Sequence, residues 1–306
     1  MRSAIVTGAD GFICSHLIRE LLQHDVKVTA VILPGFENHP RILPIRDSVN
    51  LVTWDYRSAD EIQGKMPDAD VLYHFAWQGV APEKRKLLQA QLPNIQICLN
   101  TMELAVRKKV RKFIFPGSTN EYMYCQEPIS SQSKPNADNA YGAVKLAARF
   151  LCREFAAEHQ ISFIYSVIAG IYSEDRRDSN VVFYVIDCLL KGISPELTAL
   201  QQKVNYVHID DVVNGLYLIG EKGKKDWYGI GSEENLPLCE YIEQIHKLVA
   251  PEAPLGIGRI PYKPGTKLPH SMVDITEIVN DVGYAPGVSF QNGIQRVIQK
   301  IKDSCQ

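Results

Sequence analysis

The chain has 306 residues, of which 45% are hydrophobic, and a formal net charge of −2 at pH 7. A chain of this length can bury a large core and allows one big domain or two moderate ones. Its lysines and arginines are scattered and nearly balanced by acids, which excludes a surface dedicated to polyanions. We therefore expect no nucleic acid partner.

The seven cysteines form no Cys-x-x-Cys pair and no Cys/His cluster at metal-ligand spacing. The odd count favours a reducing compartment, and the spacing argues against a metal site. The chain enters its first predicted strand without a basic segment followed by an apolar stretch, and no apolar run approaches the roughly 18 residues that span a bilayer. We expect a soluble, cytoplasmic protein that makes no membrane contact.

The stretch Ser3–Leu22 predicts a strand, a glycine turn and a helix, because its apolar run breaks at the turn and resumes at helical spacing. The turn has the spacing Gly8-x-x-Gly11-x-x-Cys14, which departs from the usual Gly-x-Gly-x-x-Gly. A turn without any ligand is the alternative. The N–H groups and dipole at a helix N-terminus attract phosphate, and a nucleotide-binding domain commonly begins with this unit. We predict a dinucleotide ligand.

The end of the second predicted strand, Lys27–Ile32, bears on which dinucleotide binds. NAD sites usually carry an Asp or Glu there for the ribose hydroxyls. Here the first acid is Glu37, and the cations Arg41 and Arg46 follow. A 2′-phosphate would therefore meet no fixed carboxylate and could find a cation. The expected cofactor is NAD or NADP, with NADP slightly favoured.

Strands and helices alternate over the first half of the chain, which predicts an α/β fold with a doubly wound parallel sheet of the Rossmann type. We expect the fifth strand to stop at Pro116-Gly117. Ligands of such sheets bind beyond the carboxyl ends of the strands. The predicted elements are the strands Ala4–Val6, Lys27–Ile32, Leu51–Trp54, Val71–Ala76, Lys112–Phe115 and Ser162–Ile168, and the helix Asn94–Arg107.

Tyr141 is the only tyrosine in the sequence with a lysine, Lys145, four residues later. On a helix that spacing places both side chains on one face, so the ammonium should favour the phenolate and lower the pKa of Tyr141. The fifth strand delivers Ser118 to the same sheet edge. A packed tyrosine with a solvated lysine is the alternative, but the joint presence of the glycine turn and Ser118 favours a general acid or base.

These residues carry a resemblance. The chain resembles an extended short-chain dehydrogenase/reductase, of the NAD-dependent epimerase/dehydratase type that acts on nucleotide sugars. The resemblance implies that Tyr141 exchanges a proton with the sugar, that Lys145 also holds the nicotinamide ribose, and that Ser118 binds the reacting oxygen. The similar segments are TGADGF, Asp55, HFA in the fourth strand, FIFPGSTNEY, YGAVK, Val207–Asp211 (VHIDD) and Gly283-Tyr284-x-Pro286.

The resemblance also implies which residues contact the ligands. Asp55 stands where a carboxylate could accept from the adenine amine, although an ordinary strand-end Asp is as good an explanation. The implied cofactor residues are Gly8, Asp10, Gly11, Phe12, Ile13, Asp55, Tyr56, Phe75, Ala76, Tyr141 and Lys145. The implied substrate residues are Ser118, Thr119, Asn120, Arg176 and Arg177, the two arginines belonging either to a diphosphate site or to a charged loop.

The segment Ser118–Tyr122 bears on the type of reaction. Family 4,6-dehydratases need an Asp-Glu pair directly after the reactive hydroxyl residue. That pair is absent after Ser118, and after Thr119 only the acid Glu121 remains. Dehydratase chemistry therefore ranks below epimerase and ketoreductase chemistry.

We expect residues 1–168 to form the NAD(P)-binding domain, with a returning segment near 204–230, and residues 169–306 to form mainly the substrate-binding lobe. Helices such as Leu238–Val249 and Ser289–Ile301 should belong to that lobe. The family tends to dimerise through helices that correspond to Asn94–Arg107 and Tyr141–His159, so a homodimer is expected.

The function predicted from these residues is NAD(P)-dependent hydride transfer at C4 of a nucleotide-linked hexose, with Tyr141 as acid or base, in a 4-ketoreductase or a 4-epimerase. Three alternatives remain open. They are a non-catalytic dinucleotide-binding sensor, a nucleotide-sugar 4,6-dehydratase, and a reductase of hydrophobic ketones such as flavonoids or steroids.

Overall fold

The computed structural model describes residues 1–175 and 180–304. Arg176 and Arg177, which we expected near the substrate, lie outside the described residues. The strands are β1 Ser3–Thr7, β2 Lys27–Ile32, β3 Asn50–Thr53, β4 Val71–His74, β5 Lys112–Ser118, β6 Ser162–Ile168, β7 Gly170–Tyr172, β8 Lys203–Val204, β9 Tyr206–His208, β10 Trp227–Ile230 and β11 Leu236–Pro237.

The helices cover the sheet and build the second lobe. They are α1 Phe12–Gln23, α2 Leu88–Gln91, α3 Pro93–Arg107, α4 Ala140–Glu158, α5 Val181–Leu190, α6 Ile209–Lys222, α7 Leu238–Val249, α8 Thr276–Val282 and α9 Phe290–Asp303. Short 3₁₀ turns are η1 Arg46–Ser48, η2 Ala59–Glu61, η3 Gln63–Lys65, η4 Pro82–Lys84 and η5 Thr119–Glu121.

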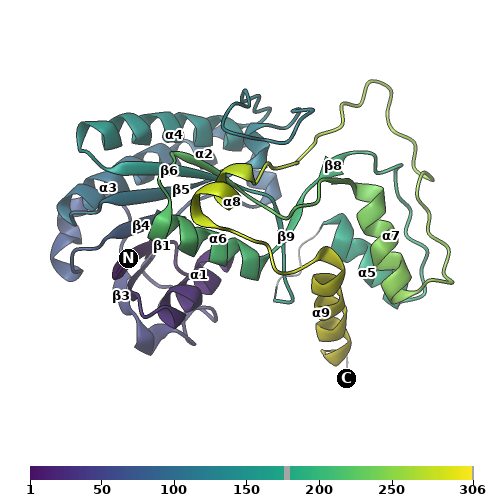
Figure 1. The fold of residues 1–306 in the computed structure, drawn as a ribbon, viewed down its shortest axis with the longest axis horizontal. Coiled ribbons are helices and arrows are strands. Elements are labelled where there is room, and N and C mark those ends of the chain that lie inside the picture. The colour runs from purple at the N-terminus through teal and green to yellow at the C-terminus, as the bar shows by residue number, and fades with distance from the viewer. Residues whose placement is uncertain (176–179, 305–306) are drawn as a thin grey trace.

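Seven parallel strands form the main sheet in the order β10-β6-β5-β4-β1-β2-β3. The chain winds outward from β1 in one direction and then from β4 in the other, so the predicted doubly wound fold is confirmed. The carboxyl ends of β1 and β4 flank the point where the winding reverses, and a crevice for a ligand forms there in open α/β sheets. In Figure 1, α3 and α4 lie along one face of this sheet, and α1 and α6 lie along the other.

Two hydrophobic clusters hold the molecule together. The larger one joins the sheet to α1, α3, α4, α6 and α8, and strands such as β4 are buried along their whole length because helices cover both faces. The smaller cluster joins α5, α7 and α9 in the second lobe. The segments α6, β10 and α8 pack with the first cluster, although they follow the second lobe's first helix in the sequence (Figure 1).

The predicted end of the fifth strand was wrong. β5 continues through Pro116 and Gly117 to Ser118, and these residues pair with Ser166, Val167 and Ile168 of β6. Proline is tolerated here because β5 pairs with β4 only as far as Ile114, so on that side no strand needs the missing N–H of Pro116. The extra residues carry Ser118 to the sheet edge. The fourth strand is shorter than predicted, since it ends at His74 rather than Ala76.

Among the described residues, no helix is long and apolar enough to cross a membrane. No group of three or more His, Cys, Asp or Glu side chains within that part of the chain is arranged to hold a metal ion.

Candidate active site

The turn between β1 and α1 brings two backbone segments unusually close together. Gly8 has φ +69°, and a Cβ at this position would lie 2.9 Å from the backbone nitrogen of Ala76. A Cβ on Gly11 would lie 2.9 Å from the carbonyl oxygen of Gly8. Glycine is therefore required at Gly8 for the turn to fit against the end of β4, and at Gly11 for the turn itself to close.

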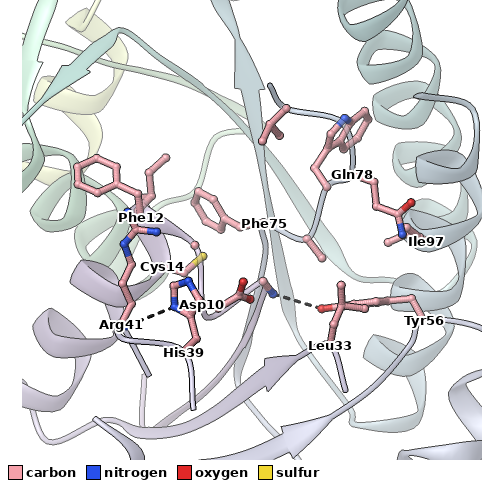
Figure 2. A pocket seen from close by; sticks show the side chains of 16 residues that line it. Asp10, Phe12, Cys14, Leu33, His39, Arg41, Tyr56, Phe75, Gln78 and Ile97 are labelled. Carbon is pink, nitrogen blue, oxygen red and sulfur yellow. Dashed lines mark hydrogen bonds between the residues drawn. The ribbon is translucent and has the colours of Figure 1, made fainter. Parts of the chain in front are cut away.

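A cavity of about 510 Å³ opens beyond this turn (Figure 2). The helix behind it, α1, has Gly11 as its N-cap residue, so no capping side chain binds its first N–H groups. The structure brings together on its wall eight of the expected cofactor residues: Gly8, Asp10, Gly11, Phe12, Ile13, Tyr56, Phe75 and Ala76. Asp55 is not part of that wall, because its carboxylate binds the backbone and side chain of Arg57.

Tyr56 holds the glycine turn in place. Its phenol oxygen accepts a hydrogen bond from the Gly8 N–H at 3.2 Å, as the dashed line in Figure 2 shows. The backbone of Tyr56 is strained, with φ +63°, and its carbonyl accepts from the Asn100 side chain at 2.6 Å. The buried Asn100 therefore helps to hold Tyr56 in the position from which it binds the glycine turn.

The end of β2 reaches the same cavity. Leu33, His39 and Arg41 line it, and the Arg41 guanidinium lies 5.9 Å from the centroid of the Phe12 ring. His39 and Arg41 stand together on one side of the cavity in Figure 2. Arg46, the other cation expected here, instead bonds the Asn38 side chain and is exposed.

A second cavity of about 390 Å³ adjoins the first. The two share Ile13, Phe75, Trp77 and Val80 in their walls. The expected catalytic and substrate residues that the structure describes all lie here: Ser118, Thr119, Asn120, Tyr141 and Lys145. Gly170, Ile171, Asn180 and Tyr206, which follow β6 in the chain, also line this cavity.

Helix α4 reaches this cavity through a capped and closely packed N-terminus. The Asn139 side chain accepts from the Gly142 N–H at 2.9 Å, as an N-cap does. A Cβ on Gly142 would lie 2.6 Å from the carbonyl oxygen of Asn120. The absence of a side chain at Gly142 therefore lets the helix start, with Tyr141, press against the turn that follows Ser118.

Hydrogen bonding from the Ser118 side chain lowers the pKa of the Tyr141 phenol. Burial has the larger effect and raises the pKa of Tyr141 to about 12, with Arg85 opposing it. The expected lowering of this pKa by Lys145 was wrong. The Lys145 ammonium donates to the Pro116 carbonyl at 2.8 Å and lies 5.8 Å from the centroid of the Tyr141 ring. Tyr141 is consequently a neutral phenol, and a proton donor, near pH 7.

The pKa of Lys145 is shifted as well. Burial lowers its pKa to about 8, while the nearby Glu121 and Cys98 oppose that change. Among the described residues, Pro116 alone accepts a hydrogen bond from it, and the rings of Trp77 and Phe115 lie against the ammonium. The charge of Lys145 at neutral pH thus depends on these neighbours.

Two hydrogen bonds hold Ser118 in place. Its backbone N–H donates to Glu121 at 2.6 Å, and its hydroxyl accepts from the Asn120 N–H at 3.2 Å. Glu121 is fully buried and also binds the Tyr165 hydroxyl. Burial raises the pKa of Glu121, against the effects of Tyr165 and Lys145. This carboxyl holds the turn from behind and does not face the cavity.

A comparison of the sequence with models of protein families agrees with this arrangement of site residues. The model described as the NAD dependent epimerase/dehydratase family matches residues 4–231, which include the glycine turn, Ser118, Tyr141 and Lys145. The chain belongs to the NAD-dependent epimerase/dehydratase family. The resemblance inferred from the sequence, and the expectation of an enzyme of this type, are confirmed.

Individual members of the family resemble the chain from end to end. It is 22% identical to the dTDP-glucose 4,6-dehydratase of Streptomyces niveus, over 98% of this chain and 93% of that one. It is 23% identical to the dTDP-4-dehydro-6-deoxyglucose reductase of Escherichia coli, over 97% of both chains. The structure of UDP-glucuronic acid 4-epimerase from Bacillus cereus in complex with UDP-glucuronic acid and NAD superposes with a TM-score of 0.81, at 22% identity over 99% of both chains.

The first cavity fits the dinucleotide that the family name implies. Gly8 and Gly11 leave a cradle that any Cβ would fill, and the uncapped start of α1 offers N–H groups and the positive end of a helix dipole to a pyrophosphate. Among the described residues of the cavity wall, the apolar side chains of Phe12, Ile13 and Phe75 provide surfaces for flat rings.

Three residues of the site escaped the sequence analysis as contributors. Glu121 was considered only as a dehydratase acid, although Ser118-x-x-Glu121 is the pattern of a capping box. Trp77 directly follows the HFA segment, but nothing in the sequence places its ring beside Lys145. Arg85 lies in an irregular segment whose path is set by packing, so the sequence carried no signal for its position.

Proposed function

We propose that the chain reduces the 4-keto group of a nucleotide-linked hexose, using NADPH or NADH. The observation that carries this proposal is the neutral phenol of Tyr141, which lines the same cavity as Ser118 beside the dinucleotide cavity. A ketone becomes an alcohol by gaining a hydride at carbon and a proton at oxygen. A phenol that stays protonated at neutral pH holds the proton that this step needs.

Each residue of the site would have a separate role in this reduction. Tyr141 donates its proton to the carbonyl oxygen as that oxygen gains negative charge, and the Ser118 hydroxyl donates a hydrogen bond to the same oxygen. The cation of Arg85 stabilises the phenolate that Tyr141 becomes, and the charged Lys145 would hold the nicotinamide ribose. When bound, the reduced nicotinamide supplies the hydride and is oxidised. The products are a secondary alcohol and a deprotonated tyrosine, which regains its proton from water.

A 4-epimerase is the second candidate. Such an enzyme needs Tyr141 first as a base and then as an acid. The hydrogen bond from Ser118 and the cation of Arg85 both lower the pKa of Tyr141 and so support the base role. A 4,6-dehydratase has less support, because the acid Glu121 is buried behind the Ser118 turn.

We infer that the preferred cofactor is NADP. The support is local: Arg41 lines the cavity at the end of β2, where Leu33 stands in the position at which an NAD site usually has an acid. Among the described residues of that wall, Asp10 is the one carboxylate, and it belongs to the glycine turn.

The substrate would lie between the lobes. Gly170, Ile171 and Asn180, from the part of the chain after residue 168, line the same cavity as Ser118 and Tyr141. This supports a division into a dinucleotide-binding part, residues 1–168 with the segment near 204–230, and a mainly substrate-binding part, residues 169–306. The sugar carbon would then be held opposite the proton donor.

We further propose a homodimer in a reducing compartment such as the cytoplasm. Large apolar side chains are exposed on α2, α4 and the residue before α3, namely Leu88, Phe150, Leu151 and Leu92. Burying such side chains against a second copy would remove apolar area from water. The cysteines within the described part of the chain are all unpaired thiols.

The test is the consumption of NADPH or NADH with a panel of nucleotide-linked 4-keto hexoses, repeated with Tyr141→Phe. We expect the variant to lose roughly 10²–10⁴-fold in turnover while its dinucleotide affinity, measured by calorimetric titration, is retained. Interconversion of 4-epimers without net cofactor consumption would identify the epimerase instead. Unchanged turnover in Tyr141→Phe would overturn the role of Tyr141.

The same experiment separates the remaining alternatives. Dinucleotide binding without turnover of any sugar would indicate a sensor. Turnover of an apolar ketone, together with no binding of UDP, dTDP, CDP or GDP, would indicate a reductase of hydrophobic substrates.

A further inference from the structure

The segment from Trp77 to Arg85, which follows β4, is built by two buried amide side chains. Asn94 accepts from the Gln78 N–H at 2.7 Å and donates to its carbonyl at 3.1 Å. Gln91 donates to the carbonyl oxygens of Gly79 at 2.8 Å and Lys84 at 3.2 Å. Both amides are 0% exposed. A loop tied to buried polar groups in this way is held in one conformation.

The same network fixes the orientation of Trp77. Its indole N–H donates to the Gln91 side chain at 3.0 Å. Gly79 has φ +73°, and a Cβ there would lie 2.6 Å from the Gln91 side-chain nitrogen, so glycine is needed where the segment turns past this amide. One buried glutamine thus holds the loop and the indole together.

The Trp77 ring lies directly against Lys145. The Lys145 nitrogen is 4.1 Å from the indole centroid and 4.7 Å from the centroid of Phe115. The edge of the Trp77 ring also meets Tyr141, with centroids 5.9 Å apart. Trp77 lines both cavities, so it stands where they meet.

Lys145 needs such a partner. A buried ammonium has three donors, and in the described structure only the Pro116 carbonyl accepts from it. The face of an indole attracts a cation through its quadrupole, most strongly where water is excluded. The titratable groups that face this ammonium are Glu121 from η5, Cys98 from α3 and Tyr141 from α4.

We propose that Trp77 is a positioning residue of the catalytic site, which keeps the Lys145 ammonium charged and in place above its ring. The proposal rests on the proposed function in so far as a charged Lys145 is needed for turnover. Its physical content, the contact between an indole and an ammonium, is independent of that function and is measured separately.

The first test uses the cofactor-free protein. Tryptophan emission is recorded from pH 6 to pH 10 in the wild type, Trp77→Phe and Lys145→Met. We expect a change in the wild type with its midpoint near the Lys145 pKa of about 8. This change should disappear in both variants, since each removes one partner of the contact. The same midpoint in Lys145→Met would overturn the proposal.

The second test is the pH dependence of kcat in Trp77→Leu, Trp77→Phe and Trp227→Phe. Loss of a desolvated cation–π contact lowers the Lys145 pKa further, so the alkaline limb of Trp77→Leu should move down by about one pH unit. Trp77→Phe keeps an aromatic face and should move less. Trp227→Phe removes a buried tryptophan of β10 and controls for a general loss of packing in the sheet. The alkaline limb of its kcat profile should match that of the wild type.

The outcomes remain distinguishable from those for the proposed function. If the alkaline limb of the kcat profile is the same in Trp77→Leu as in the wild type while Tyr141→Phe is inactive, the proposed role of Trp77 is wrong and the proposed function is retained. If Tyr141→Phe is fully active, the proposed function falls, and the emission titration of the cofactor-free protein still decides whether Trp77 holds Lys145.

Discussion

The backbone N–H of Tyr141 donates a hydrogen bond to the carbonyl oxygen of Arg85 at 2.9 Å, and the guanidinium of Arg85 lies 5.3 Å from the centroid of the Tyr141 ring. One residue therefore contacts the candidate proton donor through both its main chain and its charge. The main-chain bond survives a substitution of the side chain, which removes the charge and also the hydrogen bond from the Arg85 Nε to the Val80 carbonyl oxygen.

We expect Arg85→Gln to raise the pKa of Tyr141, because the cation that stabilises the phenolate is removed. In the direction of alcohol oxidation, where Tyr141 must be deprotonated, the rising limb of the pH profile should move up by about one pH unit. Arg85→Lys keeps the charge and should restore most of the profile. Lys86→Gln removes an exposed cation next in the chain and serves as the control; a shift of equal size in this variant would contradict the assignment to Arg85.

Gly142→Ala tests the close packing between α4 and the turn after Ser118. The added methyl group would lie 2.6 Å from the Asn120 carbonyl oxygen, so the helix start and Tyr141 must move away. A displacement of about 1 Å at reacting groups can lower kcat on the order of 10²-fold. Steady-state kinetics would show this loss. Gly64→Ala, where nothing lies within 4 Å of the added Cβ, should behave as the wild type.

Arg41→Ala tests the choice between NADPH and NADH. A charge-assisted contact to a 2′-phosphate is worth about 1.5–3 kcal/mol, so the variant should lose about 10- to 100-fold in affinity for NADPH relative to NADH. Calorimetric titration with both dinucleotides gives the ratio directly. Arg46→Ala removes the nearby cation that bonds Asn38 and should leave the ratio alone. An unchanged ratio in Arg41→Ala would count against NADP.

Asp70 provides a test of stability that does not involve the active site. Its carboxylate accepts from the N–H groups of Arg2 at 2.6 Å and Ser3 at 3.2 Å, which tie the start of β1 to the residue before β4. The Arg2 N–H is the largest cause of the lowered pKa of Asp70 in the folded protein. A carboxyl whose folded pKa is lowered stabilises the fold above its unfolded pKa, and this contribution is lost as the pH falls through the folded value.

We therefore expect Asp70→Asn to lower the free energy of unfolding near pH 7 by about 1 kcal/mol, with the difference from the wild type shrinking towards pH 3. Urea denaturation at several pH values would measure it. Asp68→Asn breaks an exposed ion pair with Lys109 and should change stability little at any pH. A pH-independent difference for Asp70→Asn would show that charge is not the cause.

The sequence predicted the parallel sheet and six of its seven strands, because these follow from local periodicity, whereas β10 was not predicted. Helix Leu238–Val249 and strand Ser162–Ile168 were located to the residue. The extension of β5 through Pro116 was missed, because whether a proline is tolerated in a strand depends on how far the neighbouring strand extends. That dependence is a property of the sheet and not of the segment.

The site was predicted in its parts but not in its electrostatics. Spacing placed Tyr141 and Lys145 on one helix face, yet it could not reveal that burial raises the pKa of the phenol and lowers that of the ammonium. The cations and rings that act on this pair, Arg85 and Trp77, come from a loop about 60 residues earlier in the chain. Their contacts with Tyr141 and Lys145 arise from tertiary packing, which local patterns do not encode.

The shared wall of the two cavities has a thermodynamic consequence. Ile13, Phe75, Trp77 and Val80 belong to both, so a molecule bound in one cavity touches side chains that a molecule in the other must also touch. Binding in the two places is then coupled, and coupling free energies are reciprocal. Whatever factor the dinucleotide adds to the affinity for a sugar nucleotide, the sugar nucleotide adds to the affinity for the dinucleotide. How tightly the enzyme retains its cofactor in a cell would then depend on the supply of its substrate.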